Sequence, residues 1–274
     1  MEKEKQLAIF EQNIGVNTVP YIAVGGGKGG VGKTMVTYLL AKRLSKLGKV
    51  LVLDADMGLP DFYILSGVKP KRYLEEYFEG KATLDDIVTK IDHNLYLMSP
   101  KSGDDYLVSL DNKQAMELLT KLEEYIVNNY NYFLIDLGAG IHKINQLIFA
   151  TVHYPVLVVT PDIMSIIDAY AFVKSVFQNF RKTYFYAIVN QTRSDLDYKK
   201  TINVLRKSVK SFHKNIEIEG LGHIPFDSRL SQGDIPEEIN KHVDEILRNL
   251  LKDRFKIVEE KKGFWSKIAS FFRR

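Results

Sequence analysis

The sequence predicts an α/β fold in which a mostly parallel sheet of about seven or eight strands carries helices on both faces. Short apolar runs alternate with longer segments of helical periodicity along most of the 274 residues. Glycine-rich or acidic segments directly follow several of the apolar runs. Strand, helix, strand, repeated in this way, builds a parallel sheet that binds ligands beyond the carboxyl ends of its strands.

Each element is expected from its local pattern. Runs such as YIAV and VLVL are apolar at successive positions, which is typical of strands buried on both faces. The expected strands cover residues 21–24, 49–53, 95–98, 132–135, 155–159, 184–189 and 219–223. The expected helices cover residues 34–47, 112–129, 164–180, 198–214 and 236–252. We divide the chain into an N-terminal segment (1–19), one domain (20–254) and a C-terminal segment (255–274).

Composition excludes several functions. The chain has no cysteine, which excludes disulfides, thiolate catalysis, Cys-ligated zinc and Cys-ligated iron–sulfur clusters, and fits a reducing cytosol. No apolar leader and no run of about 18 apolar residues is present, so we expect neither a signal peptide nor a spanning helix. The net charge is +4, but residues 261–274 alone carry five cations and no acid. The nearly neutral remainder gives little support to nucleic-acid binding.

The segment after the first strand has the pattern of a phosphate-binding loop. It reads Gly-x-x-x-x-Gly-Lys-Thr, between an apolar run and a helical segment. Backbone N–H groups of such a loop surround phosphate oxygens, Lys33 would neutralise the β- and γ-phosphates, and the Thr34 hydroxyl would bind Mg²⁺. The alternative is a glycine-rich turn that matches by chance. The expected nucleotide contacts here are Gly27, Lys28, Gly29, Gly30, Val31, Gly32, Lys33 and Thr34.

The loop contains a lysine in addition to Lys33, and with this extra lysine the loop resembles that of a known family. KGGVGKT resembles the deviant Walker A motif of the MinD/ParA class of ATPases, in which the early lysine, here Lys28, crosses a dimer interface to the partner's phosphates. The resemblance spans residues 20–250. It implies slow, Mg²⁺-dependent ATP hydrolysis by an ATP-bound homodimer, with Lys28, Lys33 and Asp56 as catalytic residues. The alternative is that Lys28 is an ordinary exposed loop residue.

Carboxylates follow two further strands. DADMGLPD resembles the first switch of the family, where Asp56 positions the attacking water and Asp54 lies near the metal. NYFLIDLGAGI places Asp136 at the Walker B position, so that Thr34, Asp54 and Asp136 form the expected Mg²⁺ site. Gly138 opens a second switch whose N–H groups can sense the γ-phosphate. The alternative for the aspartate pair is a solvated turn cap.

Weaker matches indicate the base-binding end and the subfamily. By the resemblance, Asn190 in AIVNQTRS reads adenine, and Pro225 in LGHIPFD flanks the base; a strand-end cap is the alternative for Asn190. DADMGLPD, IDLGAGI and DAYAFVK together look closest to the MinD-like flagellar number regulators (FlhG/FleN/YlxH). Leu137 departs from the threonine expected there. We expect His142 to begin a helix rather than to act as a base.

The sequence GFWSKIASFFRR predicts a short amphipathic helix at the C-terminal end. Twelve helical residues reach about 18 Å, too short for a hydrocarbon core of about 30 Å, so we expect the helix to lie flat on anionic lipid. Packing on its own domain or on a partner is the alternative. The expected membrane contacts are Phe264, Trp265, Lys267, Ile268, Phe271, Phe272, Arg273 and Arg274.

Together these features predict a cytoplasmic ATPase that associates reversibly with the inner face of the cell membrane and regulates flagellar number or placement. A MinD-type division-site regulator and, less favoured, a ParA-like DNA-partitioning ATPase are the alternatives. The expected partners are a second copy, a flagellar assembly protein or a signal-recognition-type GTPase. The N-terminal segment shares only Gln6 with the GTPase-activating segment of the flagellar regulators, so a helix packed on the domain is preferred there.

Overall fold

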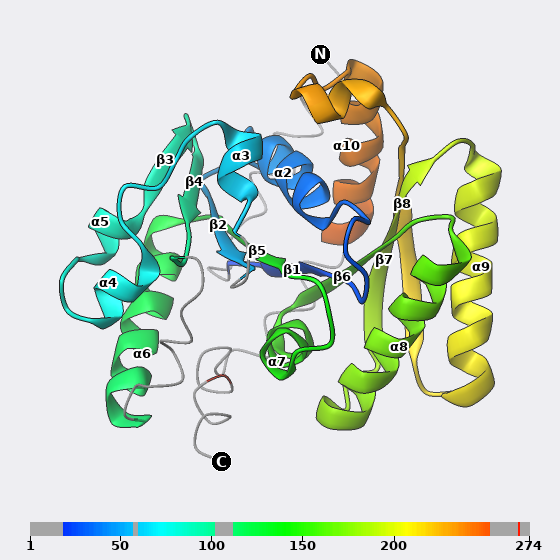
Figure 1. Cartoon of the computed structure of the whole chain (residues 1–274), viewed down its shortest axis with the longest axis horizontal. Coiled ribbons are helices and arrows are strands. Elements are labelled where there is room, and N and C mark those ends of the chain that lie inside the picture. Colours follow the sequence, from blue (N-terminus) through cyan, green and yellow to red (C-terminus); the bar gives the residue numbers. More distant parts are fainter. Residues whose placement is uncertain (1–18, 57–59, 102–111, 253–267, 269–274) are drawn as a thin grey trace.

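The computed structural model describes residues 19–56, 60–101, 112–252 and 268, with side chains in the helix at 112–129 described from residue 119. Its centre is one eight-stranded sheet of order β3-β4-β2-β5-β1-β6-β7-β8 (Figure 1). The bounds are β1 Tyr21–Gly25, β2 Val50–Ala55, β3 Thr89–Asp92, β4 Leu95–Met98, β5 Tyr132–Leu137, β6 Tyr154–Val159, β7 Tyr184–Thr192 and β8 Glu217–Pro225. Only the β3–β4 pair is antiparallel among these strands.

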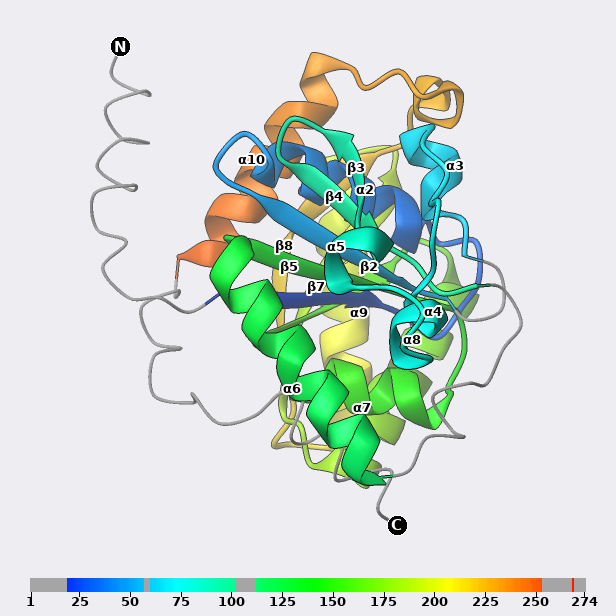
Figure 2. The same cartoon turned by 90° about the vertical axis from the view of Figure 1, so that its left-hand side faces the viewer.

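Helices cover both faces of the sheet. They are α2 Lys33–Leu44, α3 Phe62–Ser66, α4 Leu74–Phe78, α5 Leu84–Ile87, α6 Asn112–Asn129, α7 Lys143–Thr151, α8 Ile163–Phe180, α9 Asp195–Phe212 and α10 Glu237–Leu251, with the short 3₁₀-helix η2 Ser228–Gln232. Helices α2, α3 and α10 lie on one face, and α6, α7, α8 and α9 lie on the other (Figures 1 and 2). The predicted fold class is therefore confirmed.

Two apolar layers hold the helices to the sheet. Strands β1, β2, β5 and β6 are buried at every position, because both of their faces are covered. On the face of α6–α9, Phe149 packs its ring against Phe172 and Phe185, with centroids 5.1 and 6.0 Å apart. On the other face, Phe62 of α3 packs edgewise on Tyr38 of α2. These layers fix the strand ends from which the polar loops emerge.

The sequence predicted the long elements well and the short ones poorly. Helix α6 has the expected bounds, and α8, α9 and α10 differ from expectation by a few residues at either end. Strand β3 was not predicted, because its four residues alternate between charged and apolar at an edge of the sheet. Helices α3, α4 and α5 were also missed, and the extent of α7 was not predicted, since runs of four to nine residues give little periodic signal. His142 begins α7 as its N-cap, as expected.

The C-terminal segment is described at one residue. Ile268 is 4% exposed and belongs to the apolar cluster on the α6–α9 side of the sheet. The other expected membrane contacts, Phe264, Trp265, Lys267, Phe271, Phe272, Arg273 and Arg274, lie outside the described residues. In the described part of the chain, no helix is long and apolar enough to cross a membrane.

Candidate nucleotide-binding site

The loop between β1 and α2 has the backbone that phosphate binding requires. Gly30 and Gly32 adopt positive φ angles of 77° and 86°, in the left-handed region that favours glycine, and Gly32 caps the first turn of α2. A Cβ on Gly27 would come within 2.2 Å of the backbone oxygen of Asp168 on α8. The loop is thus packed directly on α8, and the N-terminal end of α2 opens towards it.

Lys33 lies inside this loop. Its side chain is buried, and its ammonium donates a hydrogen bond to the backbone oxygen of Lys28 at 3.2 Å. Burial lowers the pKa of Lys33, and the opposing charges of Asp136, Asp56 and Asp61 act to raise it. The ammonium therefore spans the loop at the point where phosphate oxygens would enter.

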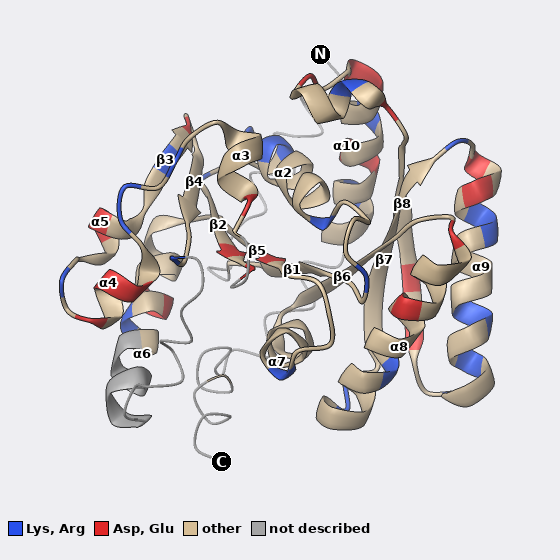
Figure 3. Cartoon of the chain, viewed as in Figure 1, with Lys and Arg blue, Asp and Glu red and all other residues tan. Residues whose placement is uncertain are grey.

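Two buried aspartates meet beside Lys33. Asp54 is the last residue but one of β2, Asp136 is the last residue but one of β5, and the two are paired in the register of the sheet. Figure 3 shows acidic residues in red where β2 and β5 lie side by side. Burial raises the pKa of Asp54 to about 7, and burial with the charge of Asp54 raises the pKa of Asp136 to about 7. Asp136 accepts a hydrogen bond from the Thr37 hydroxyl at 2.8 Å and another from Thr34. Such a buried acidic pair favours a nearby cation, and the charge of Lys33 interacts with Asp136.

The donor set fits a magnesium ion bound partly through water and phosphate. No cluster of three or more histidine or carboxylate ligands occurs among the described residues. Mg²⁺ commonly uses one or two carboxylates, a hydroxyl, waters and phosphate oxygens instead. Thr34 and Asp136, already in contact, would hold the ion, which would shield the negative charge of the bound phosphates.

Asp54 has a more structural position than the sequence suggested. Its two carboxylate oxygens accept hydrogen bonds from the backbone nitrogens of Asp56, at 3.2 Å, and Phe62, at 3.1 Å. Asp54 therefore fixes both ends of the segment that begins with Asp56. It lies next to the expected metal position through its pairing with Asp136, while its hydrogen bonds hold the first switch.

Asp56 lies against Gly138, the residue at which the expected second switch begins. A Cβ on Gly138 would come within 2.9 Å of the Asp56 carboxylate, so these two segments meet. Asp56 is also close enough to Lys33 to affect its pKa. The amide nitrogen of Asn145 on α7 donates a hydrogen bond to the backbone oxygen of Gly138 at 3.3 Å, and this bond fixes the start of the expected second switch. The structure therefore brings Lys33, Asp56 and Gly138 together at one point.

Lys28 lies at the surface of the loop. Its ammonium forms a 2.9 Å ion pair with Asp162, and both side chains are close to half exposed. Asp162 also caps α8 by accepting hydrogen bonds from the backbone nitrogens of Met164 and Ser165. An exposed pair of this kind contributes about 0–1 kcal/mol, so it does not hold Lys28 firmly.

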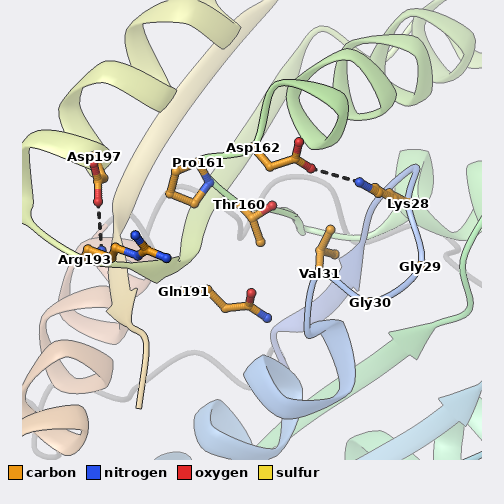
Figure 4. Close-up of a pocket in the computed structure, with 10 residues that line it drawn as sticks. All are labelled: Lys28, Gly29, Gly30, Val31, Thr160, Pro161, Asp162, Gln191, Arg193 and Asp197. Carbon is orange, nitrogen blue, oxygen red and sulfur yellow. Dashed lines mark hydrogen bonds and ion pairs between the residues drawn. The ribbon is translucent and has the colours of Figure 1, made fainter. Parts of the chain in front are cut away.

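A cavity of about 490 Å³ lies beside the outer side of the loop (Figure 4). One wall is the loop itself, and the opposite wall comes from the ends of β6 and β7 and the start of α9. Figure 4 shows Gln191 and Arg193 extending into the space from the wall opposite the loop. The lining residues are Lys28, Gly29, Gly30, Val31, Thr160, Pro161, Asp162, Gln191, Arg193 and Asp197.

The expected base contacts lie near this cavity but do not line it. Asn190 is buried, and its amide nitrogen donates to the backbone oxygen of Val31 at 2.9 Å, which ties β7 to the loop. Pro225 is half-buried at the end of β8, beside Thr192 of β7. Sequence reasoning missed Gln191 and Arg193, which lie one and three residues after Asn190; their position at the carboxyl end of a strand was the available signal.

The fold and the site define a P-loop nucleotide-binding protein. A model of the CobQ/CobB/MinD/ParA nucleotide binding domain matches residues 22–237. The flagellum site-determining protein YlxH of Helicobacter pylori is 33% identical over 77% of this chain and 71% of its own length. The antiactivator FleN of Pseudomonas aeruginosa is 32% identical over 77% of this chain and 75% of its own.

Solved structures show the same fold. The MinD cell division protein of Aquifex aeolicus matches with a TM-score of 0.66 at 23% identity, over 85% of this chain and 97% of its own. A plasmid partition protein of Borrelia burgdorferi matches with a TM-score of 0.65 at 18% identity, over 86% of this chain and all of its own. The chain belongs to the MinD/ParA family of nucleotide-binding ATPases, and its likeness to the flagellar regulators of that family is confirmed.

The packing of the loop on α8 predicts different costs for two glycine substitutions. Gly27→Ala would force a methyl group against the backbone of Asp168, whereas Gly29→Ala would approach Ala139 only to 3.8 Å. We expect Gly27→Ala to cost about 1–3 kcal/mol of unfolding free energy, and Gly29→Ala to stay within about 0.5 kcal/mol of the wild type. Thermal unfolding without nucleotide measures both. Equal stability of the two variants would contradict the close contact.

The aspartate pair predicts a pH dependence of stability. Because folding raises these pKa values from 3.8 to about 7, the folded chain holds protons that the unfolded chain releases between these values. The pair therefore makes the nucleotide-free chain less stable as pH rises through this window. At pH 8 we expect Asp136→Asn to raise the unfolding midpoint by about 2–4 °C or more, which corresponds to about 1 kcal/mol.

At pH 5 this gain should disappear, because the wild-type carboxyls are then protonated. Differential scanning fluorimetry at both pH values measures the difference. Asp234→Asn, at an exposed position away from the site, is the matched control and should change neither midpoint. A gain for Asp136→Asn that is equal at both pH values would contradict the assignment.

Proposed function

We propose that this chain is a switch ATPase that dimerises with ATP, associates with an anionic membrane surface and regulates the number or placement of flagella. The observation that carries the proposal is the position of Lys28. Lys33, Asp56 and Asp136, the residues expected to act in hydrolysis, lie on the inner side of the loop. The Lys28 ammonium lies at the outer surface of the loop, where among the described residues its side-chain hydrogen bond is to Asp162. A second lysine placed outward is suited to the phosphates of a facing copy.

The surroundings of Lys28 support a second copy as its partner. Three apolar side chains on the first turns of α8, Ile163, Met164 and Ile167, are each about half exposed or more. Their cluster adjoins the Lys28–Asp162 pair, because Asp162 is the N-cap of the same helix. Apolar side chains exposed next to a charged, easily released lysine are suited to burial in a symmetric interface.

The flagellar assignment rests on the relatives. YlxH carries the name flagellum site-determining protein, and the chain covers more than two thirds of its length. A MinD-type division-site regulator is the second candidate, because a septum site-determining MinD of Mesostigma viride is 33% identical over 76% of this chain and 72% of its own. Affinity capture from the native organism with Asp56→Ala separates the two. Recovery of flagellar C-ring or export-associated GTPase proteins favours the first, and recovery of division proteins favours the second.

The C-terminal segment supplies the proposed membrane contact. Ile268 is buried on the domain in this structure, so it must leave the domain if the segment is to bind lipid. One segment with a few basic and apolar residues binds lipid marginally, whereas two segments joined in a dimer gain a high effective concentration. ATP would then control membrane binding by controlling the number of segments that act together.

Dimerisation should depend on Lys28. With Mg²⁺ and a non-hydrolysable ATP analogue, we expect the wild type to elute as a dimer and Lys28→Ala to remain a monomer in size-exclusion chromatography with light scattering. The reason is that the substitution removes the cation that the outer surface of the loop would offer to the facing phosphates. Lys46→Ala, at an exposed position just beyond the C-terminal end of α2, is the control and should dimerise normally. A Lys28→Ala dimer would rule out this role.

Membrane binding should depend on both nucleotide and the C-terminal aromatics. We expect the wild type to sediment with phosphatidylglycerol vesicles at least about tenfold better with ATP than with ADP, because two segments bind together. Trp265→Glu should abolish this difference, whereas Phe212→Glu, at an exposed aromatic on the domain, should not. Equal sedimentation with ATP, with ADP and without nucleotide would contradict the membrane switch.

A further inference from the structure

His223 of β8 lies behind the segment that carries Gln191 and Arg193, the two residues that line the cavity across from the loop. The His223 side chain is 12% exposed, and both of its ring nitrogens have partners. Nδ1 lies 2.6 Å from the Thr192 hydroxyl, and Nε2 lies 3.1 Å from the Asp195 carboxylate. Tyr198 stacks on the ring at 5.4 Å, and His242 packs edgewise on it at 4.6 Å. The imidazole thus joins β8 to the end of β7 and the start of α9.

The surroundings fix the protonation of the ring. Burial and the nearby His242 lower the pKa of His223, while the charges of Asp195 and Glu245 act to raise it. The ring is therefore neutral at pH 7 and carries one proton. Asp195 can only accept, so Nε2–H donates to it and Nδ1 accepts from the Thr192 hydroxyl. Both hydrogen bonds need an imidazole in this tautomer, which makes the contact specific.

The two hydrogen bonds of His223 hold an unusual segment of backbone. Gln191 has a φ of 59°, a left-handed conformation that is uncommon for a residue with a side chain. The register between β7 and β8 shifts at the same place, between Asn190 and Thr192. A bulge of this kind re-aims a side chain, and here Gln191 points into the cavity (Figure 4). Strained backbone persists only where its neighbours hold it.

Arg193 lies between the two partners of His223. Thr192 precedes it, Asp195 follows two residues later, and its backbone nitrogen donates to Asp197 at 2.9 Å. Thr192 is held a second time, since its backbone oxygen accepts from Phe226 at 2.8 Å. Gln191 and Arg193 line the cavity across from the loop, so a ligand whose phosphates lay on the loop would present its nucleoside to their side chains.

We propose that His223 is a positioning residue for nucleotide binding: its bonds to Thr192 and Asp195 hold Gln191 and Arg193 against the nucleoside of ATP. The inference deepens the proposed ATPase function and rests on it. His223 acts on the ligand only through this segment. Its loss should therefore weaken the part of the affinity that comes from the nucleoside and leave the part that comes from the phosphates.

The test compares two ligands at pH 7.5. Isothermal titration with Mg²⁺ measures the Kd for ATP and for inorganic tripolyphosphate, which has no nucleoside. His223→Phe keeps a ring between Tyr198 and His242 and removes both hydrogen bonds. We expect it to bind ATP about tenfold more weakly or worse and tripolyphosphate within about twofold of the wild type. A variant that had merely lost its fold would lose both ligands.

Two further variants sharpen the result. His223→Asn retains an acceptor for the Thr192 hydroxyl and should recover part of the ATP affinity. His93→Asn, at an exposed histidine between β3 and β4, is the matched control and should bind both ligands normally. Unchanged ATP affinity in His223→Phe, or an equal loss for the two ligands, would overturn the inference. A wild-type chain that binds neither ligand would overturn the proposed ATPase function and this inference with it.

Discussion

The arrangement of the site depends on a balance of buried charge at the carboxyl ends of β2 and β5. Asp54 and Asp136 are paired in the sheet, and Lys33 lies buried in the loop nearby, close enough to Asp136 for the two charges to interact. The strands that carry the two acids are themselves buried at every position, so neither acid can move into water. Buried charges held in this way favour a ligand that neutralises them, and Mg²⁺ with a triphosphate would do so.

The same constraint explains why the central site could be predicted from the sequence and its periphery could not. The glycine-rich loop, Asp56 and Asp136 each follow an apolar strand, and the carboxyl ends of parallel strands meet at one edge. Adjacency in the sheet therefore followed from local pattern alone. Gly138 and Asp56 are far apart in the sequence, yet the two segments meet in the structure, since both follow strands at this edge.

Other features depend on side-chain geometry that no pattern contains. Asn190 was expected to face a base, but its amide nitrogen bonds to the loop at Val31. Asp54 was expected near the metal, and its oxygens prove to hold the backbone of the first switch. The bulge at Gln191 arises from the register of β7 on β8, which local sequence does not determine. Ile268 is buried on the domain, which an amphipathic pattern permits without specifying.

The contact of Gly27 with Asp168 has a mechanical consequence. The loop touches α8 there without any intervening side chain, and Lys28 joins the start of the same helix through Asp162. Helix α8 has 18 residues and extends for about 27 Å as a stiff rod. A phosphate that displaced the loop would therefore push directly on this helix. The C-terminal end of α8, where the Arg181 guanidinium covers the Phe177 ring, would then move with the helix. Ligand binding at the loop would in this way be coupled to the surface at the other end of α8.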